Sequence, residues 1–229
     1  MTSRATTRTD RAGAARAALL AILVSNAGTA LAESRTLTAE IWVDNWFEMY
    51  ADGEKVLEDS VPITTERSFN AETVTFTAEL PLTIAIVAKD FKENDSGLEY
   101  IGTRRQQTGD GGMIAQLTDA ETGEVVAVTD AGMRCVVVHR APVDLACADE
   151  TDPVAGEGAC DFVETAIPSG WTTADFDDGA WPAATEHGAA QVDPKGGYDR
   201  IAWDASARLV WSEDLVLDNT VLCRMTVGD

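Results

Sequence analysis

Apolar and polar residues alternate along most of the chain beyond residue 35, with the period of two that places side chains on opposite faces of a β-strand. Polar turns separate these runs, and helical character is confined to short turns near Asp175–Phe176 and Trp181–Thr185. This pattern predicts an all-β fold, a single jelly-roll-like antiparallel β-sandwich. The predicted strands are Thr36–Val43, Glu72–Leu80, Pro81–Asp90, Gly112–Asp119, Glu124–Asp130, Met133–His139, Ala207–Ser212 and Asn219–Val227.

A β-hairpin is marked near the start of this region. The apolar runs WFEMY (Trp46–Tyr50) and KVLED (Lys55–Asp59) flank the tetrapeptide Ala51-Asp52-Gly53-Glu54. Because Asp-Gly readily takes the positive φ angles of a tight primed turn, we expect these two runs to pair.

The first 32 residues have a different character. Four arginines precede the apolar run Ala17–Val24, and Ala30-Leu31-Ala32 follows as a small-x-small cleavage site. This order predicts a signal peptide over 1–32 and an exported domain over 33–229, in the periplasm or secreted. The apolar run is too short to span a bilayer, and we expect no membrane span elsewhere.

Charge narrows the range of partners. The sequence has 17 basic and 39 acidic residues, a formal net charge of −22. Such a surface repels nucleic acid and anionic lipid, so neither is an expected partner. The excess of carboxylates fits either a solvated, self-repelling surface or adaptation to a saline medium.

Four cysteines predict two disulfides in an exported chain. Cys147 and Cys160 bracket a polar loop, so a local bridge is the simplest pairing there. Cys135 and Cys223 lie in apolar runs and are expected to join neighbouring strands. A zinc site is the competing interpretation, but no cysteine pair has CxxC spacing. Residues 141–169, with three prolines and little periodicity, are interpreted as a disulfide-stapled connector.

Several short segments together resemble a known family. DNWFEMYADGEKV (Asp44–Val56) resembles the early hairpin of galactose-binding-like jelly rolls, the modules found appended to bacterial glycosidases. The later segments PLTIAIVAKD, GMIAQLTD, GW…DFDDGAWPAA, ARLVWS and DNTVLCR are similar to strands and to a paired-aspartate, double-tryptophan element of such modules. The chain departs from the pattern in its connector and in having no room for an appended catalytic domain.

The resemblance implies a carbohydrate-binding role, with contacts from loops at one end of the sandwich. Trp171 and Trp181 have two interpretations. They either plug an open end, with the acids of Asp175–Asp178 satisfying the turn, or form an aromatic platform for sugar. The expected ligand contacts are Asp44, Asn45, Trp46, Arg104, Arg105, Trp171 and Trp181.

A calcium site is the second candidate, and a solvated acidic turn is its alternative. The resemblance implies a structural Ca²⁺, since galactose-binding-like folds often hold one. Oxygen-rich loops suit this cation. The candidate ligands are Asp90, Glu93, Asn94 and Asp95.

Catalytic signatures are absent from the sequence. His139 and His187 are far apart, and the hydrolase, metalloprotease and nucleotide-binding motifs do not occur. We expect a non-catalytic module that binds carbohydrate or another polar cell-envelope ligand. The alternatives are a structural or assembly protein of the envelope that binds another protein and, last, an acid-pair glycoside hydrolase.

Overall fold

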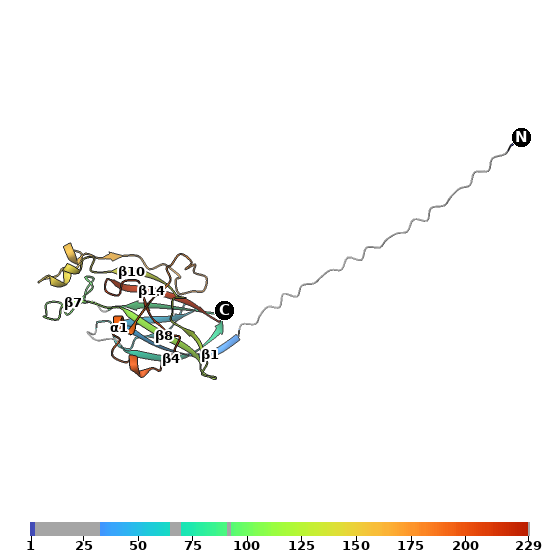
Figure 1. The fold of residues 1–229 in the computed structure, drawn as a ribbon, viewed down its shortest axis with the longest axis horizontal. Helices are drawn as coiled ribbons and strands as arrows, with labels where there is room; N and C mark the ends of the chain where they lie inside the picture. The colour runs from blue at the N-terminus through green and yellow to red at the C-terminus, as the bar shows by residue number, and fades with distance from the viewer. Residues whose placement is uncertain (3–32, 65–69, 91–92, 229) are drawn as a thin grey trace. The chain divides into compact units, whose positions relative to one another are not determined.

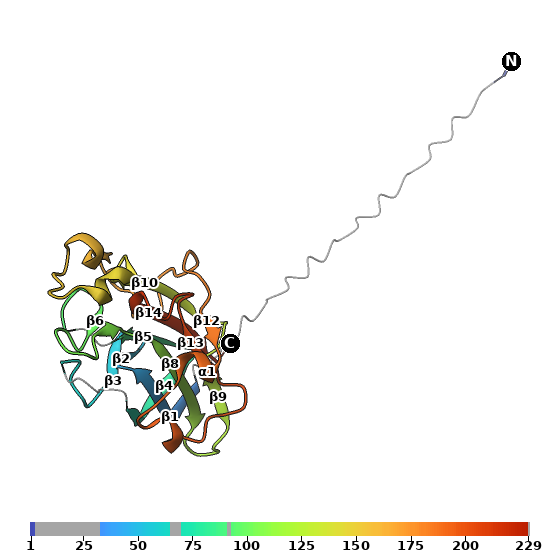
Figure 2. The same ribbon diagram turned by 60° about the vertical axis from the view of Figure 1, so that its left-hand side comes forward.

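The computed structural model describes residues 1–2, 33–64, 70–90 and 93–228. Nearly all of the predicted signal peptide lies outside these residues and remains a prediction. From Glu33 onward, the described chain forms two antiparallel sheets packed face to face (Figure 1, Figure 2). No described helix is long and apolar enough to cross a membrane.

Each of the two main sheets has six strands. The first runs, in spatial order, through β12 (Thr185–His187), β13 (Leu209–Trp211), β8 (Gly112–Asp119), β1 (Glu33–Asp44) and β4 (Ala71–Leu80), and β9 (Val125–Val128) also pairs with β8. The second runs through β11 (Val163–Glu164), β10 (Arg134–Arg140), β14 (Asp218–Val227), β5 (Leu82–Lys89), β2 (Trp46–Ala51) and β3 (Glu54–Glu58).

Shorter elements lie between these strands. Strands β6 (Leu98–Glu99) and β7 (Gln107–Thr108) form a small ladder of their own. The helical elements are α1 (Ala189–Val192) and the 3₁₀ turns η1 (Leu145–Asp149), η2 (Gly158–Cys160) and η3 (Tyr198–Arg200). The sequence did not predict α1, and the short helical turn expected at Trp181–Thr185 is instead a bend that leads into β12.

Alternate residues of the two sheets meet in one apolar core. Leu37 and Ile41 of β1 pack in the same cluster as Ile84 and Ile86 of β5, and all four are fully buried. Burial of such a side chain contributes about 1.5–3 kcal/mol. Each run predicted to be extended forms a strand, so the predicted antiparallel β-sandwich is confirmed.

The predicted hairpin joins β2 to β3. Asp52 and Gly53 have φ angles of 45° and 90°, the left-handed pair that a tight primed turn requires. Tyr50 pairs with Lys55, and Met49 pairs with Leu57 beyond a bulge. The Asp-Gly signal therefore identified both the turn and the strands it joins.

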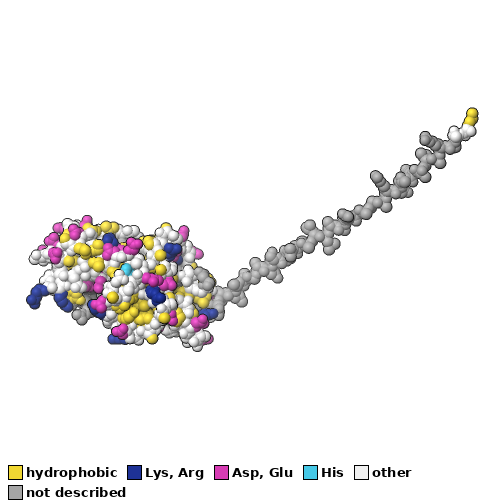
Figure 3. Space-filling view, viewed as in Figure 1, with side chains coloured by type: hydrophobic (Ala, Val, Ile, Leu, Met, Phe, Trp, Pro, Cys, Tyr) yellow, Lys and Arg dark blue, Asp and Glu magenta, His cyan; other side chains and the backbone are white. Residues whose placement is uncertain are grey.

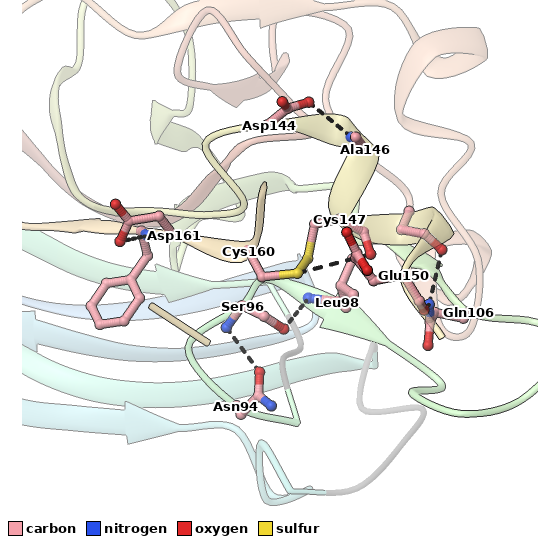
Figure 4. Close-up of a disulfide and its surroundings, with 12 residues drawn as sticks. Asn94, Ser96, Leu98, Gln106, Asp144, Ala146, Cys147, Glu150, Cys160 and Asp161 are labelled. Atoms are coloured by element: carbon pink, nitrogen blue, oxygen red, sulfur yellow. Dashed lines mark hydrogen bonds between the residues drawn. A yellow bond between two sulfur atoms is a disulfide. The ribbon is translucent and has the colours of Figure 1, made fainter. Parts of the chain in front are cut away.

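Both predicted disulfides are present. Cys135 of β10 lies directly opposite Cys223 of β14, with 4.1 Å between their Cα atoms, and this bridge is part of the core. Cys147 of η1 and Cys160 of η2 close the local bridge within the connector (Figure 4).

Two later segments cover the outer faces of the sheets. Trp171 packs on Trp46, Val87 and Leu222, which point outward from the second sheet. Tyr198 and the neighbouring side chains of the 188–208 segment pack on the outer face of the first sheet. The segment with the two tryptophans thus covers a sheet face and does not plug an open end, which corrects our structural interpretation. The physical reason lies in β5, whose continuous apolar run LTIAIVAK is buried on both faces.

The described ends of the sandwich lie close together. Glu33 pairs with Leu80, and Val227 pairs with Leu82, so both flank the β4–β5 connection. Strand β1 then runs away from this point to Asp44, where the loops described below gather.

Candidate functional site

Loops at the Asp44 end of β1 enclose a cavity of about 530 Å³. The lining residues come from segments far apart in sequence. They are Asp44, Glu99 of β6, the adjacent Tyr100, Gln107 of β7, Asp110 just before β8, and Lys195 and Gly196 between α1 and η3. The cavity is thus polar, and carboxyl groups dominate its wall.

Two of the carboxyl groups, those of Asp44 and Asp110, have raised pKa values. Burial, together with the nearby Asp110 and Glu99 carboxylates, raises the pKa of Asp44 well above its ordinary value. Burial also raises the pKa of Asp110, although Lys195 opposes this shift. Glu99 is buried as well, and its Oε2 accepts a hydrogen bond from Gln107 Nε2 at 3.0 Å. The wall can therefore both donate and accept hydrogen bonds.

Among the described residues that line the cavity, Lys195 is the only lysine or arginine. Its ammonium pairs with Asp193 at 3.0 Å, and the hydrogen bond to Asp193 raises the pKa of Lys195. The Lys195 carbonyl accepts a hydrogen bond from Trp42 Nε1 at 2.9 Å. Because Trp42 is fully buried, this bond fixes the lysine backbone at the cavity edge.

Tyr100 adopts a backbone conformation that is costly for a bulky residue. Its φ is 54°, in the left-handed region. Two bonds hold its carbonyl, donated by the Thr103 backbone N–H at 3.1 Å and the Thr103 hydroxyl at 2.7 Å. The Arg105 guanidinium lies 4.2 Å from the Tyr100 ring centroid, a cation–π contact. The loop thus presents an oriented aromatic ring at the cavity.

The connector supports the hairpin that carries Glu99, Tyr100 and Gln107. Leu98 packs against the Cys147–Cys160 bridge (Figure 4). Gln106 Nε2 donates to the carbonyls of Ala148 and Glu150 at 2.9 and 2.8 Å. The disulfide-stapled connector therefore packs behind one wall of the cavity and supports it.

The structure brings together only some of the expected ligand contacts. Asp44 lines the cavity, and the buried Asn45 follows it, with its backbone N–H bonded to the Lys89 carbonyl at 2.9 Å. Arg105 reaches the site through Tyr100. Arg104 is exposed beside it.

The three tryptophans form a separate cluster, away from the cavity. Trp46 and Trp171 are 9% and 8% exposed on the outer face of the second sheet, and Trp181 is half-buried there. The Trp171 and Trp181 ring centroids are 6.5 Å apart. Since these rings cover a sheet, we no longer propose Trp46, Trp171 and Trp181 as ligand contacts.

A buried arginine organises this cluster. Arg224 of β14 is 3% exposed, and its Nε donates to Asp178 Oδ2 at 2.7 Å. Its remaining nitrogens donate to the carbonyls of Trp171, Thr173 and Phe176. The sequence carried a signal for this role, an arginine within the apolar strand run TVLCRMTV, but it did not indicate the partner.

In the acidic turn proposed for calcium, side-chain oxygens already accept hydrogen bonds from backbone N–H groups. Glu93 Oε1 accepts from the Ile101 backbone N–H at 2.8 Å, and Asn94 Oδ1 accepts from Ser96 at 2.9 Å (Figure 4). Asp95 lies 3.9 Å from His139, and Asp90 is buried against Gly109. Within the described ranges, no three His, Cys, Asp or Glu side chains gather as metal ligands. We do not carry the calcium prediction at this turn further.

Sequence reasoning missed most of the cavity wall. Glu99, Tyr100, Gln107, Asp110 and Lys195 occupy loops without a recognisable motif. Asp110 lies between Gly109 and Gly111 in the connection from β7 to β8. Gly111 is needed because a Cβ there would meet the Trp211 ring at 2.2 Å, which places Asp110 close against the sandwich.

Comparisons with protein-family models, curated proteins and solved structures found no match for this chain. The antiparallel β-sandwich is therefore established by its own strands and register, and no relative supports the resemblance to galactose-binding-like modules.

Proposed function

We propose that the protein is an exported, non-catalytic binding module whose acidic cavity holds a carbohydrate or another polar ligand of the cell envelope. The observation that carries this proposal is the wall of buried carboxyl and amide groups around a cavity of about 530 Å³. Ligand cavities commonly have volumes of about 300–1,000 Å³, with a few polar groups that fix orientation.

Sugar hydroxyls match the chemistry of this wall. Each hydroxyl can donate to a carboxylate and accept from a protonated acid, an amide or an ammonium. Asp44 and Asp110, whose pKa values are raised, accept hydrogen bonds as carboxylates and donate one when protonated. The Tyr100 ring offers an apolar face to the carbon side of a sugar ring.

Export is part of the proposal. The two disulfides indicate a non-cytoplasmic location, because such bonds persist mainly in oxidising compartments. The predicted leader over 1–32 and the resemblance to galactose-binding-like modules support a periplasmic or secreted binding protein. Acidic side chains spread over the face in Figure 3 favour a neutral or cationic ligand over nucleic acid.

A glycan array with matched variants tests the site. We expect Asp110→Ala and Tyr100→Ala to weaken glycan binding at least tenfold, because each removes a polar or stacking contact of the wall. Trp181→Ala is the control, since its ring lies on the outer face of the second sheet. Retained binding in both cavity variants, with loss in Trp181→Ala, would return the site to the tryptophan cluster.

A specific observation favours the alternative of an envelope assembly protein. The connector exposes large apolar side chains, namely Val143, Leu145, Val154, Val163 and Ile167. This alternative would be supported if the glycan array shows no binding and one envelope protein co-purifies with the wild type. The co-purification should be lost in Leu145→Asp. Turnover of a glycoside that Asp44→Asn abolishes would instead revive the acid-pair hydrolase.

A further inference from the structure

A second cluster of oxygen atoms lies where the chain crosses from β3 to β4, and so from one sheet to the other. Asp59 is 6% exposed, and its Oδ1 accepts from the Val61 backbone N–H at 2.7 Å. Its Oδ2 is buried without a hydrogen-bond partner. The Oδ1 of Asn70 is also buried without a partner. These two acceptors lie in one acidic cluster with Glu72.

The donors of Ser60 and the Asn70 amide group bond to Glu72. Its Oε1 accepts from the Ser60 backbone N–H at 3.2 Å, from the Ser60 hydroxyl, and from Asn70 Nδ2 at 2.6 Å. Rotating the Asn70 amide by half a turn would bring its oxygen against the Glu72 carboxylate. Amide rotation therefore exchanges one unsatisfied acceptor for another and does not resolve the shortage of donors.

No described lysine or arginine forms a salt bridge with this cluster. Burial raises the pKa of Asp59 to about 7, and the Glu72 and Glu58 carboxylates add to this shift, whereas the Val61 backbone N–H and the Asn70 side chain oppose it. Lys55, on the adjacent strand β3, bonds to Glu48 and Glu58 instead. Among the interactions of the described residues, no salt bridge reaches Asp59 or Glu72. A buried carboxylate in this position is stabilised by a proton or by a cation.

We propose that Asp59, Asn70 and Glu72 form a binding site for a hard divalent cation, with Ca²⁺ as the best match. Carboxylate and amide oxygens are the ligands that Ca²⁺ prefers, and it tolerates irregular sets of about six to eight oxygens, which water or backbone carbonyls complete. Two carboxylates neutralise its two charges.

Such a cation would tie the two sheets together at one edge. Asp59 follows β3 in the second sheet, whereas Glu72 lies in β4 of the first. The site is distinct from the acidic cavity, and its proposal does not depend on the proposed function. Its role is structural, because it fixes the crossing segment at both of its described ends.

Thermal unfolding of the purified protein at pH 8, in millimolar CaCl₂ or in EDTA, tests the proposal. We expect Ca²⁺ to raise Tm on the order of 5 °C, because a ligand bound only by the folded state stabilises it by mass action. Mg²⁺ at equal concentration should give a much smaller shift, since it prefers a compact octahedral site.

Two variants and two controls locate the cation. Asp59→Asn should abolish the Ca²⁺ shift and raise Tm in EDTA, because it removes a buried charge. Asn70→Asp should lower Tm in EDTA and enlarge the Ca²⁺ shift, which covers the case in which Asp59→Asn fails to fold. Glu79→Gln, at an exposed position of β4, controls for general charge screening. Glu93→Gln controls for the acidic turn at 90–95.

Three outcomes would overturn the site. The first is the absence of a Ca²⁺ shift in the wild-type protein. The second is a shift that Asp59→Asn retains, or that Asn70→Asp fails to enlarge. The third is a shift lost equally in Glu79→Gln or Glu93→Gln, which would assign the effect to surface screening or to the acidic turn.

Discussion

Arg224 shows how one side chain can determine the course of a long loop. The guanidinium supplies donors in a fixed planar arrangement, and Asp178 and three backbone carbonyls of the 171–176 stretch accept from them. The loop itself has little regular structure, so its backbone groups need such a partner. The aromatic rings of Trp171 and Phe176 then follow the backbone onto the sheet.

Replacing Arg224 with methionine keeps much of the length but removes every donor. We expect a loss of roughly 3–5 kcal/mol in the free energy of unfolding, because the Asp178 carboxylate and the buried carbonyls lose their partner. Urea titration followed by tryptophan fluorescence measures it. Asp178→Asn, which keeps the guanidinium and its carbonyl partners, should cost clearly less. An Arg224→Met protein within about 0.5 kcal/mol of wild type would show that the loop is held by apolar packing alone.

At the scale of elements, the connector and the β6–β7 ladder depend on each other. The connector has only short 3₁₀ turns and a two-residue strand, so the Cys147–Cys160 bridge replaces regular structure as its main constraint. Leu98 lies against that bridge, and Leu98 begins the hairpin that carries Glu99 and Tyr100. Loosening the connector should therefore loosen one wall of the cavity.

The double variant Cys147→Ser/Cys160→Ser tests this dependence. Opening a loop of this length costs roughly 3 kcal/mol in the chain-entropy description. We expect faster hydrogen exchange at the amides of 98–107, with the β5 and β14 amides keeping most of their protection. Unchanged exchange in the 98–107 region would mean that the hairpin is held without the connector.

The strands and disulfides could be predicted from the sequence, because period-two alternation and paired apolar cysteines report local structure and core burial directly. The cavity could not. Asp44 and Lys195 are brought together by sheet register and by the Trp42 bond to the Lys195 carbonyl, which no local pattern encodes. The burial of Trp46 and Trp171 could not be predicted either, because buried and exposed tryptophans look alike in a sequence. The uninterrupted apolar stretch IAIVA (84–88) within β5 was the available sign that both sheet faces are covered.

At the scale of the whole molecule, stability should depend on pH in an unusual direction. The folded state raises the pKa values of Asp44, Asp59 and Asp110, so it binds more protons than the unfolded chain above the ordinary aspartate pKa of about 4. The stability that these groups contribute is present below about pH 4 and is lost as pH rises through their folded pKa values, about 7 for Asp59. Asp119, Asp204 and Asp214 have lowered pKa values and oppose this trend only below about pH 4.

Melting curves in EDTA from pH 4 to 9 measure this balance. We expect Tm to be highest near pH 5 and to fall toward pH 8, where the net charge of −22 adds repulsion. Added NaCl should recover part of the loss by screening. Asp59→Asn should flatten the fall between pH 5 and 8. A Tm that rises steadily to pH 8 would contradict the raised pKa values.

The pairing of Glu33 with Leu80 and of Val227 with Leu82 has a practical consequence. Strand β1 spans roughly 36 Å at 3.3 Å per residue, so the cavity at Asp44 lies at the opposite end of β1 from these two pairings. We therefore expect that attachment after Gly228, to a biosensor surface, a fluorescent reporter or a second copy, leaves the cavity accessible. Copies of the protein joined by linkers at this end would carry several cavities in one chain. Their combined avidity would make weak ligands easier to measure.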